Sequence, residues 1–240
     1  MALVKTPEEI KIMKRAAKAT EKVFASVLPF ILPGATEREI AGRMEAFAMK
    51  IKGVSALAFP PIVASGPNGV EPHAEITDRA LAAGDLVTVD FGVMMDGYAS
   101  DMTRTFIIGK LTEKQRRIYD SVKRAQAAGL KAAKAGMPCA ELDAITRGVI
   151  KKDGFAEFFI HTTGHGIGTE IHEDPRIGEK SEAVLEAGMV VTIEPGIYIE
   201  GLGGVRIEDT IVITKTGCEV ITSSIPKNRI DIKRLICLLY

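Results

Sequence analysis

One stretch decides the fold: residues 86–106 read LVTVDFGVMMDGYASDMTRTF. Apolar and β-branched residues dominate both ends of this stretch, as they do in buried β-strands. Between the two ends, Asp96-Gly97 is a residue pair typical of a tight hairpin turn, because both central positions of such a turn need positive φ. The sequence therefore predicts a β-hairpin in which Asp96 and Gly97 form a two-residue loop and Met95 faces Tyr98.

Each arm of this hairpin carries one carboxylate. In the register set by the turn, Gly92 faces Asp101, so Asp90 lies diagonally across from Asp101. Side chains alternate between the two faces of a strand, and Asp90 shares its face with Gly92. Both carboxylates then project to one side of a largely apolar sheet, where an unpaired charge costs on the order of several kcal/mol. We expect a cation between Asp90 and Asp101.

A second copy of this pattern follows later in the chain. Residues 184–196, VLEAGMVVTIEPG, align with residues 80–92, ALAAGDLVTVDFG, and place Glu194 at the position of Asp90. The following arm aligns Glu208 with Asp101. The turn of this second hairpin is glycine-rich, at residues 201–204, and an odd-length loop there places Glu194 and Glu208 on one face.

Two helix pairs precede the two hairpins. Capping residues, first-turn acids and apolar periodicity predict helices at residues 6–28, 36–52, 112–134 and 139–152. The chain thus repeats the order helix, helix, sheet, with halves at about 1–111 and 112–226. We expect an α+β fold in which two pseudo-symmetric halves surround a curved, mainly antiparallel sheet.

The composition is that of an ordinary globular protein, with 46% hydrophobic and 26% charged residues. Its 31 basic and 31 acidic residues balance, so the net charge predicts neither a nucleic-acid partner nor a membrane partner. Three cysteines without CxxC spacing argue against a disulfide framework and against a thiolate metal site: Cys139, Cys218 and Cys237. The N-terminus lacks an apolar signal core, and we expect a cytoplasmic protein.

The four histidines are concentrated near the predicted hairpins. His73 follows a loop rich in proline and glycine. His161, His165 and His172 all lie in the second half, inside a span of twelve residues. Glycines on both sides of His165 allow close backbone approach, and imidazole is both a common metal ligand and a general acid or base. The clustering favours a functional site over scattered surface histidines.

Four carboxylates and at least one imidazole form an oxygen-rich ligand set. Such a set suits Mn²⁺, Co²⁺, Fe²⁺ or Zn²⁺, and five ligands with shared carboxylates suit two ions about 3.5 to 4 Å apart. This arrangement is typical of metal-assisted hydrolysis, in which an activated water attacks a carbonyl and a carboxylate accepts its proton. The alternative is a set of structural ion pairs with Arg104, Arg206 and the lysines.

The order Asp90, Asp101, His165, Glu194, Glu208 resembles that of the pita-bread dinuclear metallopeptidases, which include methionine aminopeptidase, aminopeptidase P and prolidase. The resemblance covers about residues 4–226 and implies one catalytic pita-bread domain over residues 1–226. It implies that these five residues bind two divalent ions, with Mn²⁺ or Co²⁺ favoured, that Asp101 and Glu208 bridge them, and that Glu194 accepts the proton of the water. It further implies that three histidines contact the substrate and that an arginine lies behind the ligands: His73, His161, His172 and Arg206.

Several motifs resemble aminopeptidase P and prolidase, among them FPPIVASGPNG, DGYASDMTRTF, HTTGHGIGTEIHEDPRI and EPGIYI. They imply hydrolysis of Xaa-Pro bonds in short peptides. That branch usually has a separate N-terminal domain that contributes to substrate recognition and dimer formation. This chain starts at the catalytic domain, so we expect weak activity, and a homodimer stays open.

Two other functions stay open. The chain has the size of a methionine aminopeptidase, and some pita-bread proteins are binding modules that have lost their metal ligands. The presence of all five ligands argues against a binding module. The tail at residues 227–240 does not resemble the family's usual ending, and we assign it no role.

Overall fold

The structure, a computed structural model, describes residues 3–227. Its helices are α1 (Pro7–Val27), α2 (Glu37–Ala48), α3 (Glu113–Ala132) and α4 (Cys139–Lys152), with short 3-10 turns at Leu28–Phe30, Gly66–Val70 and Ala156–Phe158. The first-half strands are β1 (Val54–Leu57), β2 (Ile62–Ser65), β3 (Leu86–Phe91), β4 (Val93–Met95), β5 (Tyr98–Ala99) and β6 (Met102–Ile107). The later strands are β7 (Gly164–Gly166), β8 (Glu173–Ile177), β9 (Val190–Ile193), β10 (Gly196–Ile199), β11 (Gly203–Arg206), β12 (Asp209–Ile213) and β13 (Cys218–Val220). Residues 228–240, which include Cys237 and nearly all of the tail, lie outside the described residues.

The predicted helices form where their capping residues lie. Thr6, Thr36 and Thr112 are the N-caps of α1, α2 and α3, and each forms a complete capping box with the Glu or Gln three residues later. Helix α2 ends at Ala48 rather than near Lys52. The chain turns there and passes through Gly53 at φ +96°, a conformation that does not continue a right-handed helix.

The first hairpin has the predicted register. Met95 pairs with Tyr98, which confirms the two-residue turn, and Asp96 and Gly97 both have positive φ. Farther along, Asp90 pairs with Thr103, so Asp101 is diagonal to Asp90, as expected. Strand pairing is interrupted around Gly92, where a Cβ atom would come within 1.9 Å of the Ser100 carbonyl oxygen.

The second hairpin differs from the first in its loop. Ile199 pairs with Gly203, which leaves a three-residue loop at 200–202. The odd loop length that we assumed is therefore confirmed. In this register Glu194 faces Glu208, but their backbone amides bond elsewhere: Glu194 donates to the Thr163 carbonyl at 2.8 Å, and Glu208 donates to the Thr103 carbonyl at 3.1 Å.

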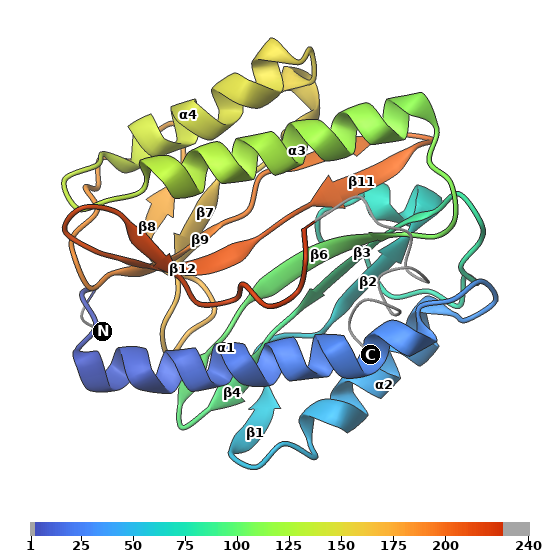
Figure 1. Cartoon of the computed structure of the whole chain (residues 1–240), viewed down its shortest axis with the longest axis horizontal. Coiled ribbons are helices and arrows are strands. Elements are labelled where there is room, and N and C mark those ends of the chain that lie inside the picture. Colours follow the sequence, from blue (N-terminus) through green and yellow to red (C-terminus); the bar gives the residue numbers. More distant parts are fainter. Residues whose placement is uncertain (1–2, 228–240) are drawn as a thin grey trace.

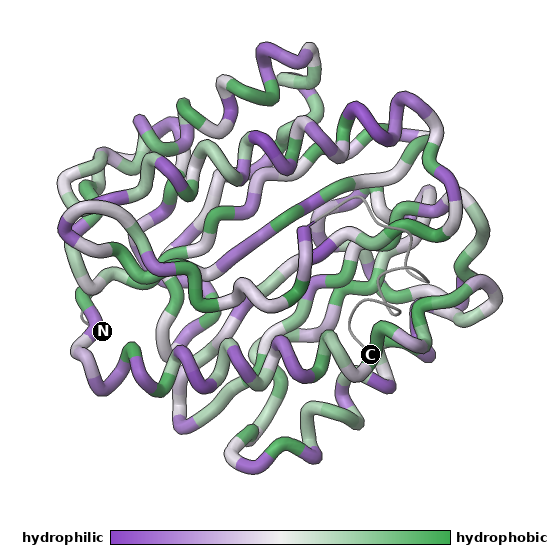
Figure 2. Tube along the Cα trace, in the orientation of Figure 1, coloured by the Kyte–Doolittle hydropathy of each residue, from purple (hydrophilic) through white to green (hydrophobic). Residues whose placement is uncertain are grey.

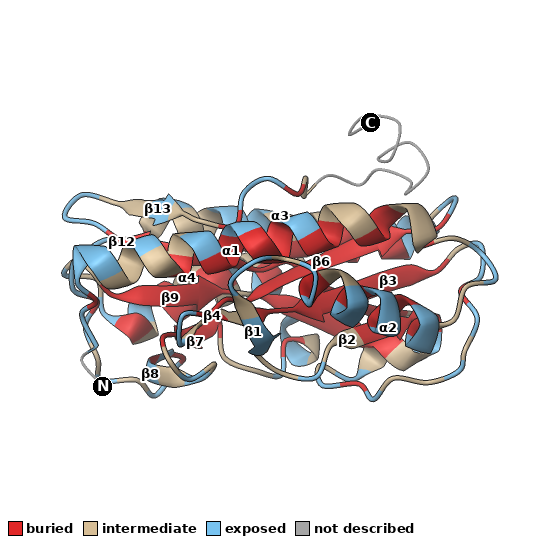
Figure 3. Cartoon of the chain, turned by 90° about the horizontal axis from the view of Figure 1, so that it is seen from below, coloured by how far each residue is buried: buried red, intermediate tan, exposed pale blue. Residues whose placement is uncertain are grey.

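These breaks divide the strands into four antiparallel sheets with orders β1-β4-β5, β2-β3-β6, β10-β11 and β13-β12-β9-β7-β8. Helices α1 and α2 lie along one edge of the molecule, and α3 and α4 lie along the opposite edge (Figure 1). The hydropathy of α1 and α3 alternates along the chain (Figure 2), and their apolar residues pack on the strands. The strands are buried along most of their length (Figure 3). Mixed helices and antiparallel sheet confirm the α+β expectation.

In both halves, the residue just before the second helix forms an isolated β-bridge with the segment that precedes the acid-bearing strand. Thr36, just before α2, forms an isolated antiparallel bridge with Ala80, and Pro138, just before α4, forms one with Val184. Each bridge lies a few residues before the acid-bearing strand of its own segment. The repeat that we read in the sequence therefore has a counterpart in backbone pairing.

No helix within residues 3–227 has both the length and the apolar character needed to cross a bilayer. The two cysteines in this part of the chain, Cys139 and Cys218, are free thiols.

Candidate metal centre

The nine residues that we expected at the site all line one pocket of about 460 Å³: His73, Asp90, Asp101, His161, His165, His172, Glu194, Arg206 and Glu208. They come from both hairpins, from strand β7 and from the loops beside these strands. Since the two hairpins lie about a hundred residues apart in the chain, only the fold brings their carboxylates together.

Three of these side chains already have the spacing of a metal site. Asp101, His165 and Glu208 are all buried, and one ligand atom from each lies within 4.8 Å of the other two. His165 Nδ1 donates to the Gly166 carbonyl at 3.0 Å, which leaves Nε2 of the neutral ring with a lone pair. That nitrogen points at the acids, 3.7 Å from Asp101 Oδ2 and 3.2 Å from Glu194 Oε1.

The carboxylates are not satisfied by the protein alone. Among the described residues, three buried side-chain oxygens have no hydrogen-bond partner: Asp90 Oδ1, Asp101 Oδ1 and Glu208 Oε1. Arg206 Nη2 lies 2.7 Å from Asp90 Oδ2, so the protein supplies a cation to one carboxylate. Arg104 instead forms an ion pair with Asp209. It donates to the backbone carbonyl of Glu208 but not to the Glu208 carboxylate. Because unpaired buried oxygens are costly and hard divalent cations bind carboxylate oxygen, this donor set fits divalent metal ions.

The pKa values of the buried carboxylates also indicate that the cluster lacks positive charge. Burial, followed by the charge of neighbouring carboxylates, raises the pKa of Asp101 and of Glu208 well above the ordinary values. Glu194 behaves differently. Burial alone would raise its pKa, but in the metal-free protein a protonated His165, as hydrogen-bond donor and as charge, lowers the pKa of Glu194 to about 2. Glu194 is therefore an ionised carboxylate at neutral pH.

Tyr198, which we did not single out from the sequence, connects two sides of the pocket. Burial raises the pKa of Tyr198 to about 12, so its hydroxyl keeps its proton at neutral pH. The hydroxyl accepts from Arg206 Nη1 at 2.8 Å and lies 3.0 Å from His161 Nε2. His161 Nδ1 lies 2.8 Å from the Thr162 carbonyl, which can only accept. Neutral His161 thus carries its proton on Nδ1 and accepts the Tyr198 proton at Nε2.

Two threonines behind the carboxylates were also missed. Thr103 Oγ1 donates to Glu208 Oε2 at 2.6 Å and accepts from Arg206 Nε at 3.1 Å. Thr192 Oγ1 donates to Glu194 Oε1 at 2.8 Å. Strand alternation could have identified both, because Thr192 lies two residues before Glu194 and Thr103 lies two residues after Asp101.

The remaining histidines border the pocket from its loops. The His172 ring meets the His165 ring edge to face, with centroids 4.4 Å apart. His73 is exposed on the loop after Gly66–Val70. Apolar side chains line the rest of the pocket: Phe59, Pro60, Pro61, Ile62, Ile76 and Ile171. The pocket thus combines a carboxylate cluster with an apolar wall, as small-molecule sites commonly do.

Comparison with known proteins gives a consistent result. The sequence model of metallopeptidase family M24 matches residues 11–215. The chain is 46% identical over 224 residues to the Xaa-Pro dipeptidase of Pyrococcus furiosus, which covers 93% of this chain and 64% of that protein. Similar solved structures include a Xaa-Pro dipeptidase from Bacillus anthracis (48% identity, TM-score 0.93) and an X-Pro aminopeptidase from Thermotoga maritima (38% identity, TM-score 0.91). Each similarity covers 95% of this chain and 64% of the other chain. The chain therefore spans less than two thirds of the length of these proteins, and their close superposition confirms the expected fold.

Proposed function

The chain belongs to metallopeptidase family M24, and we propose that it removes the N-terminal residue of short peptides, with proline favoured at the second position. The observation that carries this proposal is the set of three unpartnered buried carboxylate oxygens beside His165. Isolated buried charges cost on the order of several kcal/mol each, and Arg206 offsets only one of them. Divalent ions would compensate the rest.

The proposed ligands divide between two metal positions. Asp90, Asp101, His165, Glu194 and Glu208 would hold them, and the buried cluster of Asp101, His165 and Glu208 supports this assignment. Mn²⁺ or Co²⁺ suits this oxygen-rich set best, and Zn²⁺ or Fe²⁺ are the alternatives. Bound there, such ions would lower the pKa of a coordinated water and would polarise the scissile carbonyl.

The protein's own side chains would accept the proton of the water and bind the peptide. Glu194 is ionised and keeps 15% of its side chain exposed to the pocket, so it can accept a proton from water. His73, His161 and His172 line the same pocket and would contact the peptide around the scissile bond. The apolar wall with Phe59 and Ile76 fits the ring of a proline. Substrate preference is supported further by the names of the similar dipeptidases and aminopeptidase.

A peptide panel with a constant first residue tests the proposal. The protein is loaded with Mn²⁺ or Co²⁺ and given Met-Pro, Met-Pro-Ala and Met-Ala-Ala at equal concentrations. We expect kcat/KM to be at least about tenfold higher for the better proline peptide than for Met-Ala-Ala, since a pocket shaped for one ring can discriminate by about 1–3 kcal/mol. The ratio of Met-Pro to Met-Pro-Ala then separates dipeptidase from aminopeptidase specificity.

Two other outcomes would replace the proposal. Efficient turnover of Met-Ala-Ala with the proline peptides untouched would assign the chain to methionine aminopeptidase activity. No turnover of any peptide at full metal occupancy would instead favour a metal-containing binding module.

A further inference from the structure

His161 lies in a segment that belongs to no strand. Residues 159–163 connect the 3-10 turn Ala156–Phe158 to β7 and have no regular secondary structure of their own. The place of the His161 ring in the pocket therefore depends on whatever fixes this stretch of backbone. Two charged residues of α4 bond to this segment, which is also held at its end by the bond from the Thr163 amide to the Ile177 carbonyl of β8 at 2.8 Å.

Arg147 holds the first part of the segment. Its Nη1 donates to the Phe159 carbonyl and its Nη2 donates to the His161 carbonyl, both at 2.9 Å. The guanidinium also lies over the Phe159 ring, 4.2 Å from the centroid, and that ring meets the His161 ring edge to face at 5.1 Å. One planar cation thus fixes both the backbone of His161 and the aromatic side chain against it.

Asp143 holds the last part of the segment. Its Oδ1 accepts from the backbone amide of Thr163 at 3.1 Å and from the Thr163 hydroxyl at 2.7 Å. Its Oδ2 accepts from Arg147 Nε at 2.8 Å, one helical turn away. The Asp143 side chain has no solvent exposure, so these charge-assisted bonds have no competition from water.

The two residues do not line the pocket with the carboxylates. Arg147 instead borders an adjoining hollow, together with Arg176 and Lys180. Their influence on a substrate must therefore pass through the segment that they hold. Besides His161, that segment contains Thr163, whose carbonyl accepts from the Glu194 amide.

We propose that Asp143 and Arg147 are positioning residues that set the location and tautomer of His161 in the pocket. The proposal rests on the proposed peptidase function only in its kinetic consequence. Without Arg147 the carbonyl of His161 loses its donor, and the Phe159 ring, which packs on the His161 ring, loses the guanidinium that lies over it. The buried Asp143 then has no cation beside it.

A double-mutant cycle tests whether the effect passes through His161. We expect Arg147→Met to lower kcat/KM for the best proline peptide about tenfold in the wild-type background and less than twofold in the His161→Ala background. Equal losses in both backgrounds would overturn the proposal, because a general effect on folding does not depend on His161. Arg147→Lys keeps the charge but not the two-pronged donor, so we expect an intermediate loss of about threefold. This milder variant provides the same test if Arg147→Met does not fold.

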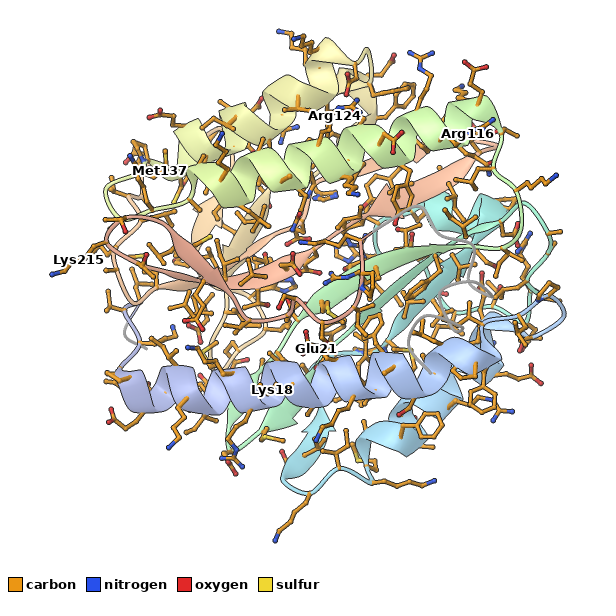
Figure 4. All side chains as sticks on the ribbon, in the orientation of Figure 1. Lys18, Glu21, Arg116, Arg124, Met137 and Lys215 are labelled. Atoms are coloured by element: carbon orange, nitrogen blue, oxygen red, sulfur yellow. The ribbon has the colours of Figure 1, made fainter. Side chains whose placement is uncertain are left out.

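The matched control is Arg124→Met. Arg124 of α3 (Figure 4) pairs with Asp153, just after α4, at 2.7 Å and is far more exposed than Arg147. The Arg124→Met substitution removes an arginine–aspartate ion pair from the same pair of helices, but this ion pair does not involve residues 159–163. We expect its kcat/KM to stay within a factor of two of wild type.

A spectroscopic measurement separates this proposal from the proposed function. With only four histidines in the chain, imidazole ¹⁵N spectra of the zinc-loaded protein can be assigned by single substitutions. We expect the Nδ1–H tautomer for His161 in the wild type and in Arg124→Met, and shifted His161 signals in Arg147→Met. Unchanged His161 signals in Arg147→Met would overturn the positioning role. If the wild type hydrolyses no peptide, the peptidase proposal fails, while the spectra still decide the positioning role.

Discussion

Thr103 and Glu208 are 105 positions apart in the chain and are joined twice: the Thr103 hydroxyl donates to Glu208 Oε2 at 2.6 Å, and the Thr103 carbonyl accepts from the Glu208 amide at 3.1 Å. Thr103 belongs to the first hairpin, where it pairs with Asp90, and Glu208 belongs to the second. This double link places the carboxylates of the two hairpins in one cluster. It also leaves Glu208 Oε1 as the oxygen available to a metal.

Thr103→Val should weaken metal binding. Valine has nearly the same shape as threonine but no hydroxyl, so Glu208 loses a donor and Arg206 Nε loses an acceptor. Substitutions behind metal ligands typically cost 10- to 100-fold in affinity or activity, and we expect a loss of about tenfold or more in affinity for Mn²⁺, measured by calorimetric titration. Thr88→Val is the control, since the buried Thr88 hydroxyl bonds to Thr105 and to a backbone carbonyl but to no carboxylate. Equal affinities of Thr103→Val and Thr88→Val would contradict this role.

Removing the metal should destabilise the protein. Metal-free protein retains three unpartnered buried carboxylate oxygens, and a ligand at about 100 times its Kd stabilises a fold by roughly 2.7 kcal/mol. For a chain of this size that corresponds to a rise in Tm of about 5–10 °C. We expect dialysis against a chelator to lower Tm by this amount, excess Mn²⁺ or Co²⁺ to restore it, and Asp101→Asn to abolish the metal-dependent part. An identical Tm with and without metal would contradict a metal site at this cluster.

Much of the first hairpin could be predicted from local sequence because its turn is short. The pair Asp96-Gly97 fixes the register, and strand alternation then places Asp90 and Asp101 on one face. The second hairpin needed an assumed loop length, because its glycines allow several turns. The positions of Glu194 and Glu208 were therefore predicted from the alignment of the second half of the chain with the first half.

The contacts between distant segments could not be predicted in the same way. Tyr198 reads as an ordinary strand residue, and its function as a link between Arg206 and His161 depends on how two segments pack. The breaks in strand pairing at Glu194 and Glu208 also have a tertiary origin, since both amides bond to residues outside their own hairpin. No periodicity within either strand encodes these partners.

The ion pair between Lys5 and Glu173 should stabilise the protein in a pH-dependent way. Lys5 Nζ lies 2.8 Å from Glu173 Oε2, and both side chains are largely buried. Burial alone would raise the pKa of Glu173, but hydrogen bonds from Lys5 and from the Glu170 amide lower it. A depressed folded-state pKa stabilises the protein above the unfolded glutamate value of about 4.3, and this stabilisation is lost as the pH falls through the folded value.

Lys5→Met measures this contribution. We expect the variant to lose about 1–2 kcal/mol of unfolding free energy at pH 7 by urea denaturation, because a buried carboxylate loses its charged donor. The difference from wild type should shrink as the pH falls from about 4.3, the unfolded glutamate value, through the lower folded pKa of Glu173. Lys14→Met is the control: Lys14 pairs with Glu219 on the surface, and exposed pairs contribute less than about 1 kcal/mol. A pH-independent effect of Lys5→Met would exclude Glu173 as its cause.

Glu194→Gln separates proton transfer from folding. Glutamine keeps the size of Glu194 and can still accept from the Thr192 hydroxyl, but it offers no ionised carboxylate to water and less charge to a metal. A general base typically contributes 10²- to 10⁴-fold, so we expect kcat on a proline dipeptide to fall by at least about 10². The fold should persist, because charge repulsion with Asp101 and Glu208 is relieved in the variant.

The control for this last variant is Glu200→Gln, in the exposed loop of the same hairpin. It changes the same side chain by the same atoms at a distance from the pocket, and its kcat should equal that of wild type. Metal content of both variants, measured after reconstitution, distinguishes a missing proton acceptor from a missing ion. Near-wild-type kcat for Glu194→Gln at full metal occupancy would show that the water loses its proton to another group, and His161 and His172 would then be the bases to test at the same pocket.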